Sequence, residues 1–353
     1  MTRSLHLVLS DPGADVLVIT NMWPDEERPV YGIFVQRQVE SLRAAGIRCD
    51  VLYLRGYRSL FAYPLAALQL AGATFRWRDR YRLVHVHAGE TSLAARFLLG
   101  PPMLVSYCGD DILGDPREDG SIPPGQRVRS ALVRAFSLLF PRTITKSRQM
   151  HERLPAVTRR RNTVIPNGVD AEPFTPEPRG AARTRLGWSS EELVVLFAAT
   201  RPDSPRKRRA LAEAAVARAA QLLALPVRLH IAGSVPPGDM PTLMNACDCL
   251  ILTSSIEGSP NVVKEALMCN LPVVATPAGD VPELLDGVVP SAVCPADEAA
   301  LADAVAEVLR SRRRSNGRTA AARLDARIAA ERVLAIYREL GLTMLPAGEA
   351  MSP

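Results

Sequence analysis

Short apolar runs rich in β-branched residues alternate with longer amphipathic segments along the whole chain. The apolar runs lie at 16–20, 49–54, 83–87, 103–107, 142–145 and 162–165, and again at 193–199, 227–233, 248–253 and 272–276. Helical stretches separate them, in the first half at about 33–45, 62–75, 92–99, 127–139 and 146–154. Such alternation is typical of parallel sheets covered by helices. We therefore predict an α/β protein with two doubly wound units in series.

The segment 166–180, PNGVDAEPFTPEPRG, separates the two units. Its four prolines and two glycines continue neither a helix nor a strand. We predict a first domain at 1–170 and a second at 171–353, and we allow the last helix to pack back on the first domain. Because open α/β sheets bind ligands beyond the carboxyl ends of their strands, the expected site is the cleft between the two domains.

Composition and charge narrow the class of protein. Apolar residues make up 47% and charged residues 23% of the chain, which excludes a disordered or collagen-like protein. The chain opens without a signal-peptide pattern, and its longest uncharged stretch, 59–75, is shorter than the roughly 20 residues that a spanning helix needs. We therefore expect a cytoplasmic protein. Residues 1–170 hold 23 Arg and Lys against 16 Asp and Glu, so anionic partners would be drawn to the first domain.

The cysteines and histidines indicate neither a metal site nor disulfides. Six cysteines are scattered without a C-x-x-C pair, and the histidines do not cluster. Scattered thiols fit a reducing compartment. We predict no metal ligands and no cofactor.

Two glutamates flank a sharp turn after the apolar run 248–253. The string IEGSPNVVKEAL separates Glu257 from Glu265 by seven residues, and Gly258, Ser259 and Pro260 suit a turn before a helix. We expect Ser259 or Asn261 to cap that helix. The start of a helix offers unpaired N–H donors to an anion, and carboxylates on either side suit the hydroxyls of a sugar and a ribose. The alternative is that neither glutamate binds a ligand: one would lie in the first turn of the helix, as ordinary helix electrostatics favours, and the other would be exposed.

The string EGSPNVVKEALMCNLPVVAT closely resembles the E-x(7)-E signature of family 4 glycosyltransferases, which are retaining enzymes of the GT-B fold. The resemblance extends from WPDEERPVYGIFVQRQVESLRAAG through VHVHAGE and IPNGVD. It implies two Rossmann-like domains that face each other across a cleft. It also implies that Glu257 contacts the transferred sugar and that Glu265 contacts the nucleotide ribose, with Gly258, Ser259, Pro260 and Asn261 in the donor-binding turn.

Basic residues follow the apolar run 193–199. The string ATRPDSPRKRR places Arg201 six residues before Lys207. Cationic donors of this kind suit a nucleotide diphosphate. The segment resembles the family pattern G-R-x(5)-K, with Thr200 in place of the glycine. The alternative is that these basic residues form the solvent-exposed start of a helix and bind no ligand.

Residues at the expected carboxyl edge of the first sheet complete the candidate site. His87 ends the run LVHVH and is our preferred catalytic histidine, while His85, on the same face of the strand, competes with it. Gly32 would let the backbone approach a diphosphate closely. Gly109 and Asp110, from YCGDDILG, are expected on the acceptor side of the cleft.

The segment RWRDRYRL at 76–83 directly follows the uncharged stretch 59–75. Apolar surface beside clustered arginines and aromatic residues is typical of a membrane-interface element or of a groove for a phosphorylated lipid. The same residues would also cap a buried helix, so peripheral membrane contact is a hypothesis.

We therefore expect a metal-independent, retaining glycosyltransferase that uses a UDP- or GDP-sugar. Its acceptor would be a glycan, a lipid-linked sugar or a small molecule, and it would act in the cytoplasm, at the inner face of the membrane. The alternative is a nucleotide-sugar epimerase or hydrolase on the same scaffold. The turn after 16–20 lacks the G-x-G-x-x-G of a nicotinamide-dependent oxidoreductase, and we identify no nucleic-acid-binding signature.

Overall fold

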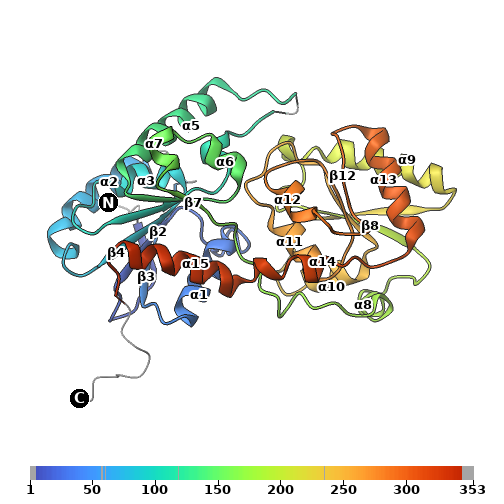
Figure 1. Cartoon of the computed structure of the whole chain (residues 1–353), viewed down its shortest axis with the longest axis horizontal. Helices are drawn as coiled ribbons and strands as arrows, with labels where there is room; N and C mark the ends of the chain where they lie inside the picture. The colour runs from blue at the N-terminus through green and yellow to red at the C-terminus, as the bar shows by residue number, and fades with distance from the viewer. Residues whose placement is uncertain (1–4, 57–58, 60, 118, 234, 344–353) are drawn as a thin grey trace, which may run out of the picture.

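The computed structural model describes residues 5–56, 59, 61–117, 119–233 and 235–343, which form two parallel sheets covered by helices (Figure 1). The first sheet has the strand order β1-β3-β2-β4-β5-β6-β7 and the second has β12-β11-β10-β8-β9. We call the part built on β1–β7 the first domain and the part built on β8–β12 the second domain. The predicted α/β class with two Rossmann-like sheets is confirmed.

The strands of the first domain are β1 (Leu5–Leu9), β2 (Val16–Thr20), β3 (Cys49–Leu54), β4 (Leu83–His87), β5 (Met103–Ser106), β6 (Arg142–Thr145) and β7 (Asn162–Val164). Those of the second are β8 (Leu193–Ala198), β9 (Val227–Ala232), β10 (Cys249–Leu252), β11 (Val273–Ala275) and β12 (Ala292–Val293). Neighbouring strands are parallel except β1, which pairs antiparallel with β3 at the edge of the first sheet. The sequence analysis missed β1 and β12, since β1 is a partly exposed edge strand and β12 has only two residues.

The helices of the first domain are α1 (Ile33–Ala44), α2 (Ala62–Trp77), α3 (Gly89–Ala95), α4 (Asp110–Leu113), α5 (Pro124–Phe136), α6 (Arg148–Glu152) and α7 (Ala156–Arg159). Further along the chain follow α8 (Arg179–Leu186), α9 (Arg209–Leu223), α10 (Met240–Ala246), α11 (Asn261–Met268), α12 (Val281–Leu285), α13 (Glu298–Ser311), α14 (Gly317–Ala320) and α15 (Ala326–Glu339). Short 3₁₀ turns lie at Ser137–Leu139, Pro205–Lys207 and Ala322–Leu324.

The helix expected at 92–99 begins earlier, at Gly89, and ends at Ala95. Its start follows β4 after a single residue, Ala88, which has a positive φ of 74°. The backbone N–H of Gly89 donates to the buried Asp111 carboxylate at 2.9 Å. A carboxylate from helix α4 therefore sets this helix start, and the spacing of apolar residues carries no signal of it.

Helix α15 returns to the first domain after the chain leaves the second (Figure 1). Its buried Val333, Ile336 and Tyr337 belong to the same apolar cluster as Val16 and Val18 of β2. Where the chain crosses between the domains, the N–H of Val169 donates to Leu324 O, and the N–H of Ala326 donates to Val169 O. The two segments that connect the domains therefore lie side by side and are hydrogen-bonded to each other. The domain boundary at 170 stays a proposal.

The hydroxyl of Tyr337 anchors α15 to the centre of the first sheet. It lies 2.7 Å from Nδ1 of His85, whose Nε2 lies 2.8 Å from Oγ of Ser106. His85 and Tyr337 are almost fully buried. Burial and the nearby Lys146 ammonium lower the pKa of His85 to about 3, so the ring is neutral in the folded chain at neutral pH.

Replacing Tyr337 by Phe should lower the stability of the chain, because it leaves Nδ1 of the buried His85 without its partner. We expect a loss of about 1–3 kcal/mol in the free energy of unfolding, measured as a shift of the urea midpoint by circular dichroism. Glu331→Gln, on the exposed side of α15, should leave the midpoint unchanged. An unchanged midpoint in Tyr337→Phe would show that the hydroxyl does not anchor the helix.

His85 should also make the stability depend on pH. Its pKa is about 3 when folded and about 6.5 when unfolded, so the neutral ring stabilises the fold above pH 6.5 and this stabilisation is lost as the pH falls below that value. The loss at pH 5 should be about 2 kcal/mol. Urea titrations of the parent and His85→Asn at pH 7.5 and pH 5 should show a stability difference that shrinks by this amount. A difference that is independent of pH would contradict the assignment.

Candidate active site

Glu257 lies in the turn after β10 and is held by two cations from the turn after β8. Its carboxylate accepts hydrogen bonds from Nζ of Lys207 and, at 3.4 Å, from Nη1 of Arg206. The side chain is buried. Although burial acts to raise the pKa of Glu257, the charges of Lys207 and Arg206 hold it below its ordinary value. The carboxylate is therefore ionised and available as a hydrogen-bond acceptor.

Backbone contacts attach the cationic turn Pro205–Lys207 to the end of β10. The hydroxyl of Thr253 donates to Lys207 O at 2.7 Å, and the N–H of Ser255 donates to Arg206 O at 2.8 Å. The neighbouring strands β8 and β10 thus deliver the cations and the carboxylate to one place. Arg201, by contrast, is exposed and forms no ion pair with the residues that the structure describes. Sequence reasoning missed Arg206, since one arginine in a run of four basic residues carries no distinguishing signal.

Helix α11 begins at Asn261, with Pro260 at the N-cap and without a side-chain cap. The prediction that Ser259 or Asn261 caps this helix is therefore wrong. The hydroxyl of Ser259 instead donates to the Asp280 carboxylate at 2.7 Å and accepts from Nζ of Lys264 at 3.0 Å. Oδ1 of Asn261 is buried without a partner among the described residues. The start of the helix therefore keeps its backbone donors clear of its own side chains.

Lys264 ties α11 to the segment that joins the domains. Its ammonium is fully buried and donates to Asn167 O at 2.8 Å. Burial lowers the pKa of Lys264 to about 8, against the opposing charge of Asp280. This lysine is a structural link between the α11 turn and the chain crossing.

Glu265 forms an ion pair between the two domains. Its Oε1 lies 2.7 Å from Nη1 of Arg37 in α1 of the first domain, and both side chains are mostly buried. A second ion pair across the domains joins Nε of Arg206 to Oδ1 of Asp115 at 3.6 Å. Sequence analysis did not find Arg37, because it lies 228 positions away and only the fold brings it to Glu265.

The backbones of the two domains touch at two glycines. A Cβ on Gly258 would lie 2.6 Å from Cys108 O, and one on Gly109, whose φ is +150°, would lie 3.4 Å from the Gly258 nitrogen. Gly258 is therefore required by the close approach of the two turns. The structure brings Gly109 to the cleft beside the α11 turn.

His87 ends β4, at the carboxyl edge of the first sheet, where the turn with Gly109 follows the neighbouring strand β5. It is 1% exposed, and its Nδ1 has no hydrogen-bond partner among the described residues. Both ring nitrogens of His85 have partners, in Tyr337 and Ser106. The structure thus distinguishes the two histidines, because His87 retains a buried ring nitrogen without a partner.

The acidic residues that follow β4 and β5, namely Glu90, Asp110 and Asp111, have protein partners. Arg129 lies 2.9 Å from Glu90 and 3.3 Å from Asp110, and burial raises the pKa of Glu90 to about 7. Asp111 accepts the N–H groups of Gly89, Cys108, Gly109 and Ile112. In the described ranges, no three His, Cys, Asp or Glu side chains gather as metal ligands would.

Gly32 precedes α1 with a φ of +76°, and a Cβ there would lie 2.3 Å from the backbone of Met22. The tight packing of the loop against residues 22–23 explains this glycine. Its predicted contact with a diphosphate stays a prediction, as do the roles of the other site residues.

Two family models match this chain, one in each domain. The model of Glycosyltransferase Family 4 matches residues 1–173, and the model of Glycosyl transferases group 1 matches residues 192–311. The D-inositol 3-phosphate glycosyltransferase of Geodermatophilus obscurus is 29% identical over 268 residues, which are 64% of this chain and 59% of that protein. The D-inositol 3-phosphate glycosyltransferase 1 of Catenulispora acidiphila is 32% identical over 144 residues, 39% of this chain and 34% of that protein. The matches thus span from about a third to about three fifths of these relatives.

Solved structures share the fold at low sequence identity. Sucrose-phosphate synthase from Thermosynechococcus elongatus has a TM-score of 0.74 and 18% identity, covering 92% of this chain and 99% of its own. Anabaena HepE in complex with UDP and glucose has a TM-score of 0.68 and 18% identity over the same shares of the two chains. With one family model matched in each domain and the arrangement of the two sheets shared with these structures, the chain belongs to family 4 of the glycosyltransferases and has the GT-B fold.

Proposed function

We propose that this chain transfers a sugar from a nucleotide-sugar to an acceptor hydroxyl with retention of anomeric configuration, without a metal ion. The observations that support the proposal are the Lys207–Glu257 contact, the Arg37–Glu265 ion pair between the domains and the uncapped start of α11 that lies between these two glutamates in the sequence. On the facing side lie Gly109 and the unpartnered nitrogen of His87. Carboxylates suit hydroxyl groups, and backbone N–H groups with a cation suit a diphosphate.

Each residue has a proposed role. Glu265 binds the ribose hydroxyls, which would replace or share its contact with Arg37. Glu257 binds the transferred sugar, and His87 donates to or accepts from a sugar hydroxyl. Arg201, Lys207 and the turn Gly258–Asn261 bind the diphosphate, with Gly32 close to it from the first domain. Asp110 and Gly109 lie on the acceptor side. Because HepE was solved with UDP, a UDP-sugar is the first donor to test, and a GDP-sugar the second.

The proposed transfer takes place on one face of the sugar. The bond from C1 to the phosphate oxygen breaks, and its electron pair stays on the diphosphate. The acceptor oxygen forms the new bond to C1 from the same face, and its proton passes to the leaving phosphate oxygen. Preorganised donors stabilise the charge that develops on the diphosphate. The helix start of α11 and the Lys207 ammonium would supply this stabilisation.

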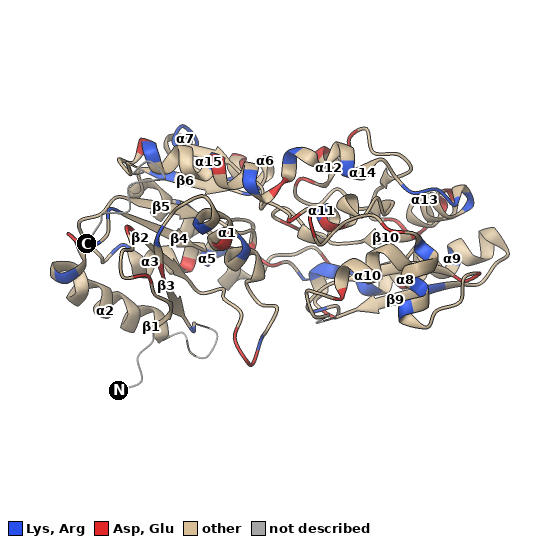
Figure 2. Cartoon of the chain, turned by 90° about the horizontal axis from the view of Figure 1, so that it is seen from below, with Lys and Arg blue, Asp and Glu red and all other residues tan. Residues whose placement is uncertain are grey.

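We also propose that the first domain contacts the cytoplasmic face of a membrane through α2. Phe61, Leu68 and Phe75 are 83%, 72% and 82% exposed, and their spacing of seven residues puts them on one face. Figure 2 shows α2 uncharged along its length, with basic residues at one end. No helix in the described part of the chain has the length and apolarity to cross a bilayer. An exposed apolar stripe beside arginines favours a surface contact with anionic lipid.

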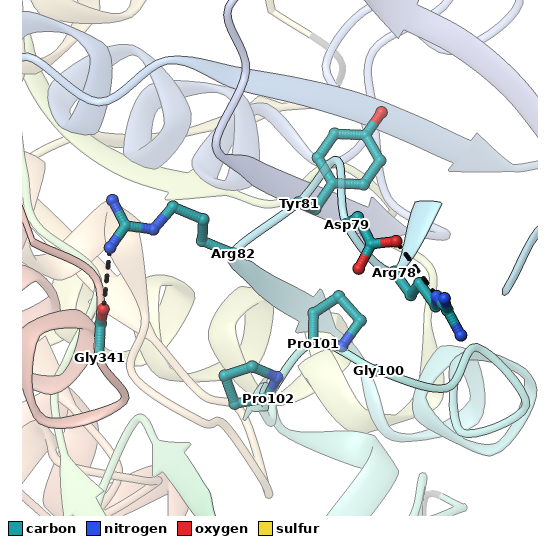
Figure 3. Close-up of a pocket in the computed structure, with 8 residues that line it drawn as sticks. All are labelled: Arg78, Asp79, Tyr81, Arg82, Gly100, Pro101, Pro102 and Gly341. Atoms are coloured by element: carbon teal, nitrogen blue, oxygen red, sulfur yellow. Dashed lines mark hydrogen bonds and ion pairs between the residues drawn. The ribbon is translucent and has the colours of Figure 1, made fainter. Parts of the chain in front are cut away.

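A shallow pocket beside the C-terminal end of α2 extends this surface (Figure 3). It is lined by Arg78, Asp79, Tyr81, Arg82, Gly100, Pro101, Pro102 and Gly341. These residues precede β4 and β5 or follow α15, so the pocket lies at the opposite edge of the sheet from His87. At that edge its arginines would face lipid headgroups and not the donor sugar.

The two glutamates should differ in effect. Glu265→Gln should weaken UDP binding about tenfold, because a hydrogen bond to a charged group contributes about 1.5–3 kcal/mol. Glu257→Gln should lower turnover about 100-fold with little change in UDP affinity, since its contact would act on the reacting sugar. Calorimetry would measure UDP binding, and nucleotide release from the tightest-binding nucleotide-sugar would measure turnover. Exposed Glu283→Gln is the matched control. Small and equal effects of both site variants would contradict these roles.

Binding to vesicles should depend on the exposed face of α2. The parent should float with phosphatidylglycerol-rich vesicles at low salt, and Leu68→Glu with Phe75→Glu should reduce the bound fraction at least about tenfold by loss of apolar burial and by charge repulsion. Leu222→Glu, at an exposed position of α9 in the second domain, should bind as the parent does. Flotation of the double variant equal to that of the parent would rule out this surface.

A further inference from the structure

Lys146 is a buried cation in the first domain. It directly follows β6, is 1% exposed, and forms neither a hydrogen bond nor a salt bridge with the residues that the structure describes. The other two lysines of the chain are engaged, Lys207 by Glu257 and Lys264 by Asn167 and Ser259. Lys146 therefore needs a different explanation.

An unpaired ammonium is costly to bury, by several kcal/mol in proteins. Burial lowers the pKa of Lys146, while Cys108 and Asp111 act in the opposite direction. The Asp111 carboxylate directs its hydrogen bonds to four backbone N–H groups and forms no ion pair with Lys146. Without a ligand, this lysine therefore has no direct ion-pair partner among the described residues.

The turn that carries Lys146 lies beside the turn that touches the second domain. Strand β6 pairs in parallel with β5, with Ile144 opposite Ser106, and the N–H of Tyr107 donates to Ile144 O at 2.9 Å, so the residues that follow the two strands are neighbours. Next in the turn after β5 is Cys108, whose carbonyl oxygen would lie 2.6 Å from a Cβ on Gly258. Burial lowers the pKa of Lys264 in α11, and the charge of Lys146 acts in the same direction. Lys146 is therefore at the junction where the turn after β5 meets the start of α11.

The charges around this junction favour an anionic ligand. Glu257 and Glu265 already have cationic partners in Lys207, Arg206 and Arg37. Lys146 has no ion-pair partner among the described residues, and Nδ1 of His87, at the end of β4 in the same sheet, is likewise buried without a partner. A diphosphate at the helix start would supply the missing negative charge.

We propose that Lys146 binds the diphosphate of the nucleotide-sugar from the first domain, so that the diphosphate is held between cations of both domains. This assignment rests on the proposed function. It makes donor binding depend on the two domains together, since neither Lys146 nor the α11 start alone surrounds the anion. It also gives the first domain a role in binding the leaving group as well as the acceptor.

The test compares binding of UDP, UMP and uridine to the parent, Lys146→Met, Lys146→Arg and the control Arg148→Met by calorimetry. Arg148 is exposed two residues further along the chain. Lys146→Met should weaken UDP binding about 10- to 100-fold, because a charge-assisted hydrogen bond is lost, and should change uridine binding less than twofold. Lys146→Arg should recover part of the UDP affinity, and Arg148→Met should match the parent. If GDP or ADP stabilises the parent more than UDP does, the same series is run with that nucleotide.

A second measurement separates ligand binding from a structural role. Without nucleotide, Lys146→Met should melt at the same temperature as the parent or higher, because the substitution removes an uncompensated buried charge. A lower melting temperature together with an equal loss of uridine and UDP affinity would mean that Lys146 supports the fold, and would overturn the proposal.

Other results also decide the question. UDP affinity within twofold of the parent in Lys146→Met would overturn the assignment. If that variant instead lost affinity for inositol 3-phosphate, measured with UDP bound, the lysine would serve a phosphorylated acceptor and not the donor. If the parent bound none of the three nucleoside diphosphates, the proposed function itself would fail, a result distinct from an effect of the variant.

Discussion

Glu257 is buried against Lys207 and Arg206, and Glu265 is held by Arg37 of the facing domain. A buried carboxylate that loses its cationic partner becomes an uncompensated charge, which is strongly destabilising. The turn after β8, the turn after β10 and helix α1 must therefore be held in fixed relative positions. The contacts between the two sheets hold these three elements in place.

Three kinds of contact hold those positions. Thr253 and Ser255 bind the cationic turn through its carbonyl groups, and Lys264 binds the chain crossing at Asn167. The glycine contact at Gly258 lets the turns of the two domains approach to backbone distance. Helix α15, which continues from the second domain, is packed into the first. The Glu265–Arg37 pair thus joins domains that are already connected at the crossing.

The cleft is unevenly charged as a result. Glu257 and Glu265 of the second domain are paired with protein cations, whereas Lys146 and the Nδ1 atom of His87 have no protein partner among the described residues. Backbone donors at the uncapped start of α11 add to the positive character of the same place. A site of this kind suits a ligand that carries both hydroxyl groups and negative charge, as a nucleotide-sugar does.

Much of the fold and part of the site could be predicted from the sequence. Local periodicity determined ten of the strands, since a buried parallel strand needs a continuous apolar run. The string around Glu257 and Glu265 identified the family, because turn, helix start and carboxylates lie within one short segment. The edge strand β1 and the early start of α3 could not be predicted, since β1 is partly exposed and the start of α3 depends on Asp111 of helix α4.

The sequence by itself therefore determined ten of the strands, the α/β class with two units in series, and the short motif that identifies the family. Only the tertiary structure decided which polar groups meet: Arg37 with Glu265, Arg206 with Glu257, Ser259 with Asp280, and Lys146 with none of the described residues. The physical reason is that hydrophobic periodicity acts over a few residues along the chain. The pairing of charges, by contrast, depends on distances in space between residues that the chain places far apart.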